Sequence, residues 1–433
     1  MVYGSPSIVH RPLSTVKTMK RFLTLFALLL LAAGSLLAVA FFAPLPIPFY
    51  QDFSVMYFTN LGRLNGVSIY AYPAQLDFVK TLTPAGFTFH PYPYPPWYAL
   101  ATLWLGLLPI QVAARTWFFV NLGLIGGSVW LLTPRWRPIP RLLGLLAAIM
   151  FIPTFGLLIV GQYSAPVLLG AALFIWATRQ KAPVWAAVGL LLTTFKPHIG
   201  GLVFLAGFGW LVYTGRLWHR SPGLDTSQRT GDYSTSGSLA TTSPTSFARR
   251  ALVSLILGGL FLLIAGFAAD AAWPLTYLQS LGRYREIPGV QTCGLCASLS
   301  VALVSLVTGQ SSTGTAAWVS LGLLLGLSVL LIWRYRAHLQ DPTALMALSA
   351  TLTLLIDPYL LNYDYILLLI ALVWLIRREK MAVLVYFLPW GALALGREGN
   401  LLLALAGLVT FFLILRQSID APSREAYNPS TTK

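Results

Sequence analysis

The chain has very little charge for its length. Asp, Glu, Lys and Arg together make up 10% of its 433 residues, whereas 57% are hydrophobic. Soluble domains carry about 25% charged residues, so this composition excludes an ordinary water-soluble fold. The apolar run from Phe22 to about Phe42 is long enough to cross roughly 30 Å of hydrocarbon. The sequence therefore predicts an all-α polytopic membrane protein.

Acidic residues are the scarcer charge, with 13 Asp and Glu against 29 Lys and Arg. The basic residues cluster beside apolar runs, which is typical of topology signals and of anchors for anionic lipid. Membrane lipids are therefore expected partners, and nucleic acid is not.

Cysteine is nearly absent. Cys293 and Cys296 form one CxxC pair, which is a weak metal signal without a second pair or a histidine cluster. On an oxidising outer face the pair could instead form a disulfide. His90 and His198 are isolated, and no glycine-rich loop precedes Lys-Ser or Lys-Thr. We therefore expect no metal or other cofactor and no ATP-driven work.

The basic clusters predict the topology, because Lys and Arg favour the cytoplasmic side. All the basic clusters lie on the cytoplasmic side if 97–109 and 297–308 are half-segments, which do not cross the membrane fully, and the remaining apolar segments make about twelve crossings. The predicted parts are a cytoplasmic arm (1–21), a front half (22–214) with an outer loop (46–97), a disordered cytoplasmic linker (215–250), a back half (251–416) and a cytoplasmic tail (417–433). The expected crossings are 22–42, 117–132, 142–160, 164–178, 183–196, 199–214, 251–270, 315–333, 343–356, 366–376, 381–395 and 400–415.

Two features of the first part of the chain refine this picture. Ala38-Val39-Ala40 also fits a signal-peptide cleavage site, which leaves a cleaved signal open as an alternative to a retained first crossing. Residues 54–71 have apolar positions at helical spacing but are too short and polar to span, so they predict a helix in the interface plane.

With this topology, the polar motifs of the chain all fall on the outer side. Asp52 is the first of them, because a carboxylate at the mouth of an apolar bundle is costly without a partner or a role. Near the hydrocarbon boundary its pKa would rise, which suits a general base. The alternative is that Asp52 caps a helix starting near Ser54.

Cations on the same side are candidates for a phosphate site. Lys196 and His198 stand at the end of a crossing, and Arg283 and Arg285 are the other outer cations near them. Lys196 and His198, with Arg283, could bind a phosphate just outside the membrane. The alternatives are that Lys196 snorkels to the interface and that Arg283 is solvated.

Amide, aromatic and acidic side chains complete the candidate site. Gln162 and Asn362 could bind sugar hydroxyls or simply satisfy helix ends. Tyr94 lies in a proline-rich turn of the outer loop, where aromatic rings could face either lipid headgroups or a sugar. Tyr363 flanks Asp364, which we expect to be functional and not only a cap.

The order and spacing of these residues resemble glycosyltransferase family 87. The resemblance extends over roughly residues 22–376, and it is carried by the order of the motifs more than by any one of them. The matching features are Asp52 followed by a short helix to Tyr70, Tyr94-Pro95-Pro96, Trp117 with Asn121, Gly161-Gln162, Lys196-Pro197, and Pro358 with Tyr363-Asp364-Tyr365.

The resemblance implies a GT-C membrane enzyme. Such an enzyme would transfer a sugar, mannose or another hexose or pentose, from a polyprenyl-phosphate donor to a hydroxyl of a lipid or glycan acceptor. The reaction would take place at the outer face of the plasma membrane, with inversion, and Asp52 would match the family's base. Some members carry a His near Tyr363 to Tyr365, and none is present here, so the role of Asp364 is open.

Two other functions compete with this one. A transporter or flippase would place ionisable residues near the middle of its crossings and broken helices in matching positions of two halves. Here the acidic residues, Asp270 included, gather at membrane edges, which favours surface chemistry. A sugar-polymer polymerase or ligase would share the outer aromatic site and differ in donor and acceptor.

Overall fold

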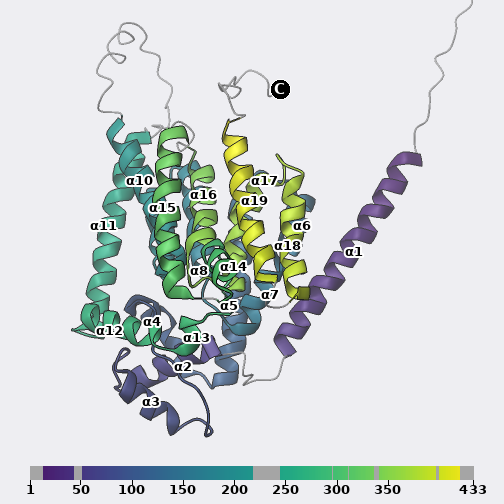
Figure 1. Cartoon of the computed structure of the whole chain (residues 1–433). Coiled ribbons are helices and arrows are strands. Elements are labelled where there is room, and N and C mark those ends of the chain that lie inside the picture. The colour runs from purple at the N-terminus through teal and green to yellow at the C-terminus, as the bar shows by residue number, and fades with distance from the viewer. Residues whose placement is uncertain are drawn as a thin grey trace, which may run out of the picture.

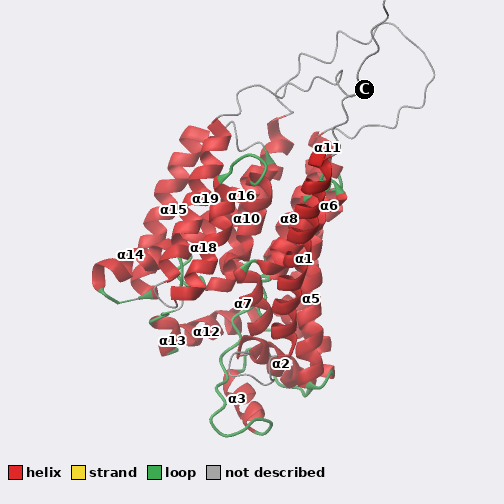
Figure 2. Ribbon diagram, turned by 90° about the vertical axis from the view of Figure 1, so that its right-hand side faces the viewer, coloured by secondary structure: helices red, strands yellow, loops and turns green. Residues whose placement is uncertain are grey.

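The structure, a computed structural model, describes residues 13–42, 51–217, 244–294, 296–310, 312–335, 341–395 and 399–419. Within these ranges the regular elements are helices, and the only strand-like pairing is one isolated bridge between Cys296 and Leu361. The predicted all-α class is therefore confirmed for the described residues (Figures 1 and 2).

The front half contains most of the predicted segments. Its first crossing is helical from Leu13, so the helix includes part of the predicted arm. The helices of this half are α1 (Leu13–Phe42), α2 (Gln51–Leu64), α3 (Tyr72–Lys80), α4 (Pro96–Thr102), η2 (Leu103–Leu107), α5 (Ile110–Leu132), α6 (Pro138–Met150), α7 (Ile152–Val160), α8 (Ala165–Gln180), α9 (Pro183–Thr193) and α10 (Pro197–Leu217).

Two segments of this half are not single straight helices. The stretch 97–109 is divided into α4, with 7 residues, and the 3₁₀ helix η2, with 5. Seven residues span about 10 Å at 1.5 Å each, so α4 is too short to cross. The predicted crossing 142–160 is instead two helices, α6 and α7, bent by 57°. Pro153 lies in the first turn of α7, where its missing N–H and its ring prevent a continuous helix.

The back half begins earlier than predicted. Helix α10 continues to Leu217 and α11 starts at Pro244, so both ends of the predicted linker are helical. Its middle, residues 218–243, lies outside the described residues, as do 1–12 of the arm and 420–433 of the tail. The helices are α11 (Pro244–Ala269), α12 (Trp273–Arg285), α13 (Pro288–Gln291), α14 (Leu299–Thr308), α15 (Thr313–Tyr335), α16 (Pro342–Ile356), η5 (Asn362–Leu367), α17 (Leu368–Leu375), α18 (Met381–Leu395) and α19 (Asn400–Ile419).

The long helices form a bundle whose two ends differ (Figure 1). The start of α1, the end of α10, the start of α11 and the end of α19 lie at one end. Helices α2, α3, α12 and α13 lie at the other. The segments predicted to face the outer side therefore gather at one end of the bundle, opposite the ends that flank 218–243.

Apolar side chains cover the outside of the bundle as well as its core. On α11, Ile256, Phe261 and Ile264 are each more than half exposed, which is typical of a surface that meets lipid. Four described helices are long and apolar enough to cross a membrane, or five if the bent pair α6 and α7 is one span. They are 110–132, 197–216, 244–269 and 400–417, and shorter apolar helices of 10–17 residues pack beside them. The chain is a helical membrane protein; the count of about twelve crossings stays a prediction.

Candidate active site

Asp52 lies in the first turn of α2, which begins at Gln51. It therefore does not precede a helix starting near Ser54, and the interpretation as a cap for that helix is wrong. Its Oδ2 accepts hydrogen bonds from Gln162 Nε2 at 2.6 Å and from the Tyr363 hydroxyl at 3.2 Å. Burial raises the pKa of Asp52 above its usual 3.8, although the bonds from Gln162 and Tyr363 and the charge of Lys196 oppose this.

Gln162 uses its whole hydrogen-bonding capacity on the protein. Its Nε2 donates to Asp52 and, at 2.7 Å, to the Tyr363 hydroxyl, while its Oε1 accepts from Lys196 Nζ and from the backbone N–H of Tyr163. Because a backbone N–H can only donate, the Tyr163 contact fixes which end of the amide is oxygen. A primary amide has two donor hydrogens and two acceptor lone pairs, so Gln162 orients Asp52 and has nothing left for a sugar hydroxyl.

Lys196 is buried, with 2% of its side chain exposed, and forms an ion pair with Asp364 at 2.6 Å. Its ammonium also donates to Gln162 Oε1 and to Ser164 Oγ, both at 3.1 Å. Three N–H groups thus meet three acceptors. The snorkelling alternative is wrong, because Lys196 points into the protein. Phosphate binding by Lys196 stays a prediction, and it requires a phosphate to replace one of these partners.

Asp364 is the other end of this chain of contacts. Its Oδ1 accepts from Lys196 and from the Ser164 hydroxyl, and its Oδ2 accepts from the backbone N–H of Leu361 at 3.2 Å. Four side chains from distant parts of the sequence are therefore linked in the order Asp52, Gln162, Lys196 and Asp364.

Breaks between helices bring these residues together. Helix α7 ends at Val160 and is followed by Gly161, whose φ of +68° is in the left-handed region that favours glycine. The indole N–H of Trp117 donates to the Gly161 carbonyl at 3.0 Å and holds this turn in place. Lys196 directly precedes Pro197, the first residue of α10, and Asp364 lies in the short helix η5.

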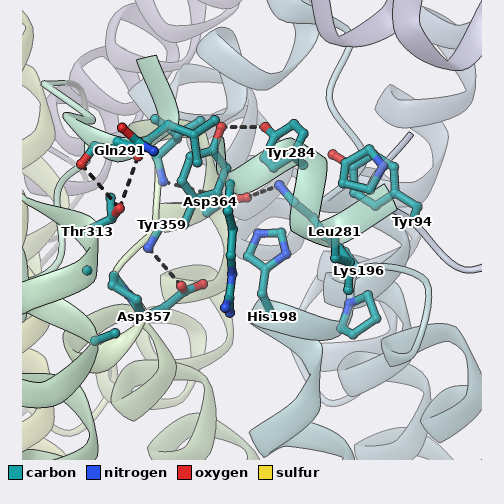
Figure 3. A pocket seen from close by; sticks show the side chains of 18 of the residues that line it. Tyr94, Lys196, His198, Leu281, Tyr284, Gln291, Thr313, Asp357, Tyr359 and Asp364 are labelled. Carbon is teal, nitrogen blue, oxygen red and sulfur yellow. Dashed lines mark hydrogen bonds and ion pairs between the residues drawn. The ribbon is translucent and has the colours of Figure 1, made fainter. Parts of the chain in front are cut away.

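A partly open cavity of about 940 Å³ lies in front of the cluster (Figure 3). This volume is within the range of roughly 300–1,000 Å³ that ligand pockets occupy. Six predicted site residues line it: Tyr94, Gln162, Lys196, His198, Tyr363 and Asp364. The other three predicted residues, Asp52, Arg283 and Asn362, do not line the cavity. Asp52 adjoins it through the hydrogen bonds from Gln162 and Tyr363.

Helix α12 carries both outer arginines that the sequence analysis named, and one of them reaches the cavity. Arg285 lines the cavity, whereas Arg283 of the same helix does not. The other lining residues of α12 are Tyr277, Leu281 and Tyr284, which with Arg285 follow the i, i+4, i+7, i+8 spacing of one helix face. That spacing was readable in the sequence and would have favoured Arg285 over Arg283.

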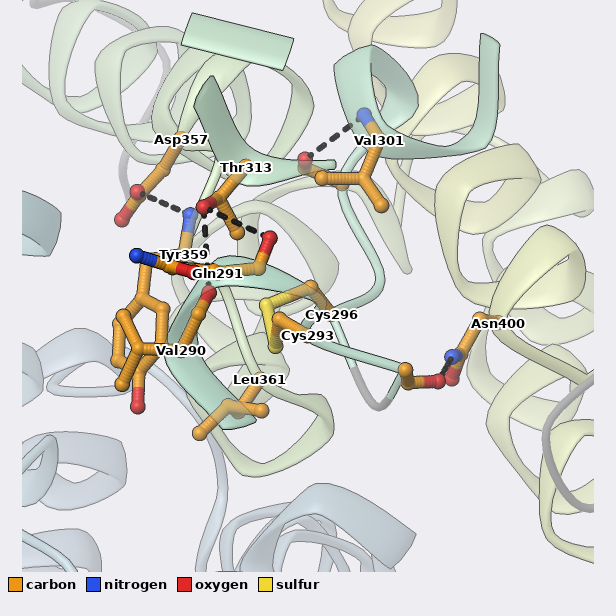
Figure 4. Close-up of a disulfide and its surroundings, with 12 residues drawn as sticks. Val290, Gln291, Cys293, Cys296, Val301, Thr313, Asp357, Tyr359, Leu361 and Asn400 are labelled. Carbon is orange, nitrogen blue, oxygen red and sulfur yellow. Dashed lines mark hydrogen bonds between the residues drawn. A yellow bond between two sulfur atoms is a disulfide. The ribbon is translucent and has the colours of Figure 1, made fainter. Parts of the chain in front are cut away.

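Cys293 and Cys296 form a disulfide (Figure 4). The disulfide alternative is therefore confirmed. The loop is tied to the segment that carries Asp364, because Ala297 N donates to Leu360 O at 2.8 Å and the Tyr365 hydroxyl donates to Ala297 O at 2.7 Å. Among the described residues, no cluster of three His, Cys, Asp or Glu could hold a metal ion.

Comparison with known families favours one of the candidate functions. Residues 92–224 match the model of glycosyltransferase family 87. The family 87 match confirms the resemblance and supports a membrane glycosyltransferase, and nothing in it supports a transporter. It includes Tyr94, Gln162, Lys196 and His198, whereas Asp52 and the segment 362–364 lie outside it. Comparisons with curated proteins and with solved structures found no match.

Proposed function

We propose that this protein transfers a sugar from a polyprenyl-phosphate donor to a hydroxyl of a lipid or glycan acceptor, at the outer face of the plasma membrane. The observation that carries the proposal is the cluster around Asp52: a carboxylate with a raised pKa, oriented by Gln162 and Tyr363, beside a 940 Å³ cavity. The family 87 match to part of the same site supports it.

The reaction is a single displacement with inversion. Asp52 takes the proton of the acceptor hydroxyl as its oxygen bonds to the anomeric carbon of the donor sugar. The bond between that carbon and the phosphate oxygen breaks, and polyprenyl phosphate leaves with its negative charge. Among the described residues, no hydrogen bond is made to Asp52 Oδ1, which leaves this oxygen available for the proton.

Cations at the cavity stabilise the leaving phosphate. Arg285 is a cation that lines the cavity and is held by no ion pair among the described residues, and the imidazole of His198, which also lines the cavity, can donate a hydrogen bond to the phosphate. The geometry favours Arg285 for this role over Arg283, which does not line the cavity, and over Lys196, which is paired with Asp364.

The test replaces the base. Asp52→Asn keeps the shape and the bonds from Gln162 and Tyr363 but cannot take a proton, so we expect transfer to fall at least about 100-fold, since general bases contribute roughly 10²–10⁴-fold. The measurement is transfer of label from a polyprenyl-phosphate sugar to a membrane lipid extract by purified protein. Asp270→Asn is the matched control, because Asp270 lies at the same end of the bundle but bonds Ser68 and Thr276 and does not line the cavity. Full activity of Asp52→Asn would reject Asp52 as the base.

A further inference from the structure

Asp357 is a cavity residue that the proposed reaction does not use. It follows α16 directly and is 7% exposed. Its Oδ1 accepts from the backbone N–H of Tyr359 at 3.0 Å, while its Oδ2 is buried and has no hydrogen-bond partner among the described residues. In Figure 3 the carboxylate points toward the interior of the cavity.

Such a carboxylate is costly to keep. Burying a charged or polar oxygen without a partner destabilises the folded state, and burial here raises the pKa of Asp357 to about 7. An apolar residue would remove this cost, so the orphaned oxygen indicates a donor group that arrives with a ligand.

The surroundings of Asp357 narrow the chemistry of that ligand. Gln291 and Thr313 lie near Asp357 (Figures 3 and 4), and they line the cavity together with Ser312; all three are polar but uncharged. The aromatic rings of Tyr359 and Trp318 also line it. Uncharged hydrogen-bonding groups beside aromatic rings fit a polyhydroxylated ring better than an anion, which the carboxylate would repel.

A metal ion does not fit as the ligand. Asp357 would be its single acidic ligand in a region where the described residues offer no cluster of three metal-ligating side chains. Ca²⁺ and Mg²⁺ prefer several oxygen ligands, carboxylates among them.

We propose that Asp357 Oδ2 accepts a hydrogen bond from a carbohydrate hydroxyl, in a subsite of the cavity separate from Asp52. This deepens the proposed function and rests on it for the class of ligand. The hydroxyl belongs either to the donor sugar or to the acceptor, and the experiment below separates these two sources.

The first measurement is sugar binding without turnover. Methyl α-mannopyranoside, methyl α-glucopyranoside and a methyl arabinofuranoside are titrated onto the purified protein in nanodiscs, because sugar-based detergents would compete, and binding is followed by saturation-transfer-difference NMR. Asp357→Asn keeps the oxygen that Tyr359 N–H needs but replaces Oδ2 by a donor, and we expect about tenfold weaker binding.

Two further variants make the result specific. Gly314 lines the cavity, and a Cβ there would meet nothing closer than Ser312 Oγ at 4.0 Å, so Gly314→Phe should block the subsite without disturbing the packing. Asp341→Asn is the matched control. Asp341 stands at the other end of α16 and lies outside the cavity. Its Oδ1 accepts a hydrogen bond from the Thr343 backbone N–H at 2.9 Å, which is the same type of contact that Asp357 makes with the Tyr359 N–H. We expect unchanged binding for Asp341→Asn.

The second measurement assigns the source of the hydroxyl. In the transfer assay, Asp357→Asn should raise the half-saturating concentration of either the polyprenyl-phosphate sugar or the lipid extract, and the affected substrate is the one that carries the hydroxyl. A wild-type protein that binds a glycoside but transfers no sugar would reject the transferase and keep the subsite. Absence of binding for all three glycosides would overturn the subsite. Unchanged binding in both Asp357→Asn and Gly314→Phe would overturn it as well.

Discussion

Replacing Gln162 by Glu tests whether this residue orients the base or contacts the sugar. In the native protein the Gln162 amide donates to Asp52 Oδ2 at 2.6 Å and so favours the ionised carboxylate. In Gln162→Glu, the oxygen facing Lys196 and Tyr163 N–H keeps its partners, but the other carboxylate oxygen faces Asp52. Two carboxylates this close cannot both be ionised, so they share a proton.

The size of the effect follows from the lost bond. A hydrogen bond to a charged group is worth about 1.5–3 kcal/mol, and one pKa unit corresponds to about 1.4 kcal/mol. In Gln162→Glu, the loss of the amide hydrogen bond therefore raises the pKa of Asp52 by about one to two units, and repulsion from the new carboxylate at position 162 raises it further. The base works only when it is ionised, so the acid limb of the rate profile should move to higher pH by at least that much.

The assay is the initial rate of sugar transfer between pH 5 and pH 9. Transfer by Gln162→Glu should be lost first at low pH and recover toward the native rate at high pH. Gln111→Glu, the same change at an exposed position at the start of α5, should leave the profile in place. An equal loss at every pH would refute the reasoning and indicate that Gln162 binds the sugar directly.

Two other predictions concern stability and topology. Lys196→Met leaves Asp364 buried without its cation and should destabilise the protein by about 3–5 kcal/mol. Adding Asp364→Asn to Lys196→Met should recover part of this lost stability. Thermal unfolding in nanodiscs measures both variants, and destabilisation that adds up from the two substitutions would contradict the pairing. Cys293 and Cys296 are the only two cysteines of the chain and are joined to each other, so an introduced cysteine is the only free thiol. A membrane-impermeant maleimide should label Ala85→Cys in intact cells and Ser234→Cys only after permeabilisation, and the reverse result would invert the topology.

The sequence predicted the positions of most helices because long apolar runs determine them. Helices α8, α16 and α18 start within one residue of the predicted crossings. The ends of α10 and α11 were missed, because the Ser, Thr and Gly content of 215–250 outweighed the short helical continuations on either side. The break at Phe151 was missed because Pro153 stands in an otherwise unbroken apolar run.

The candidate residues were predicted better than their roles. Sequence order showed that Gln162, Lys196 and Asp364 would lie on one side, but their mutual contacts span up to 168 residues of sequence and depend on packing. Lys196, expected to meet a phosphate, is paired with Asp364 in the structure, and Gln162, expected to meet a sugar, bonds Asp52. Only the complete set of partners around each atom distinguishes these roles.

The way the site is built also bears on the choice between surface chemistry and transport. Its residues stand where helices end, at Gly161, at Pro197 and at Pro358, and helix ends leave backbone groups free to hold polar side chains. The same cavity is lined by Arg285 of α12 and Gln291 of α13, which lie at the end of the bundle with α2 (Figure 1). A transporter needs its broken helices at the midplane in both halves. Breaks that converge on a cavity lined by α12 and α13 fit the proposed transfer between two substrates at one surface better than they fit transport.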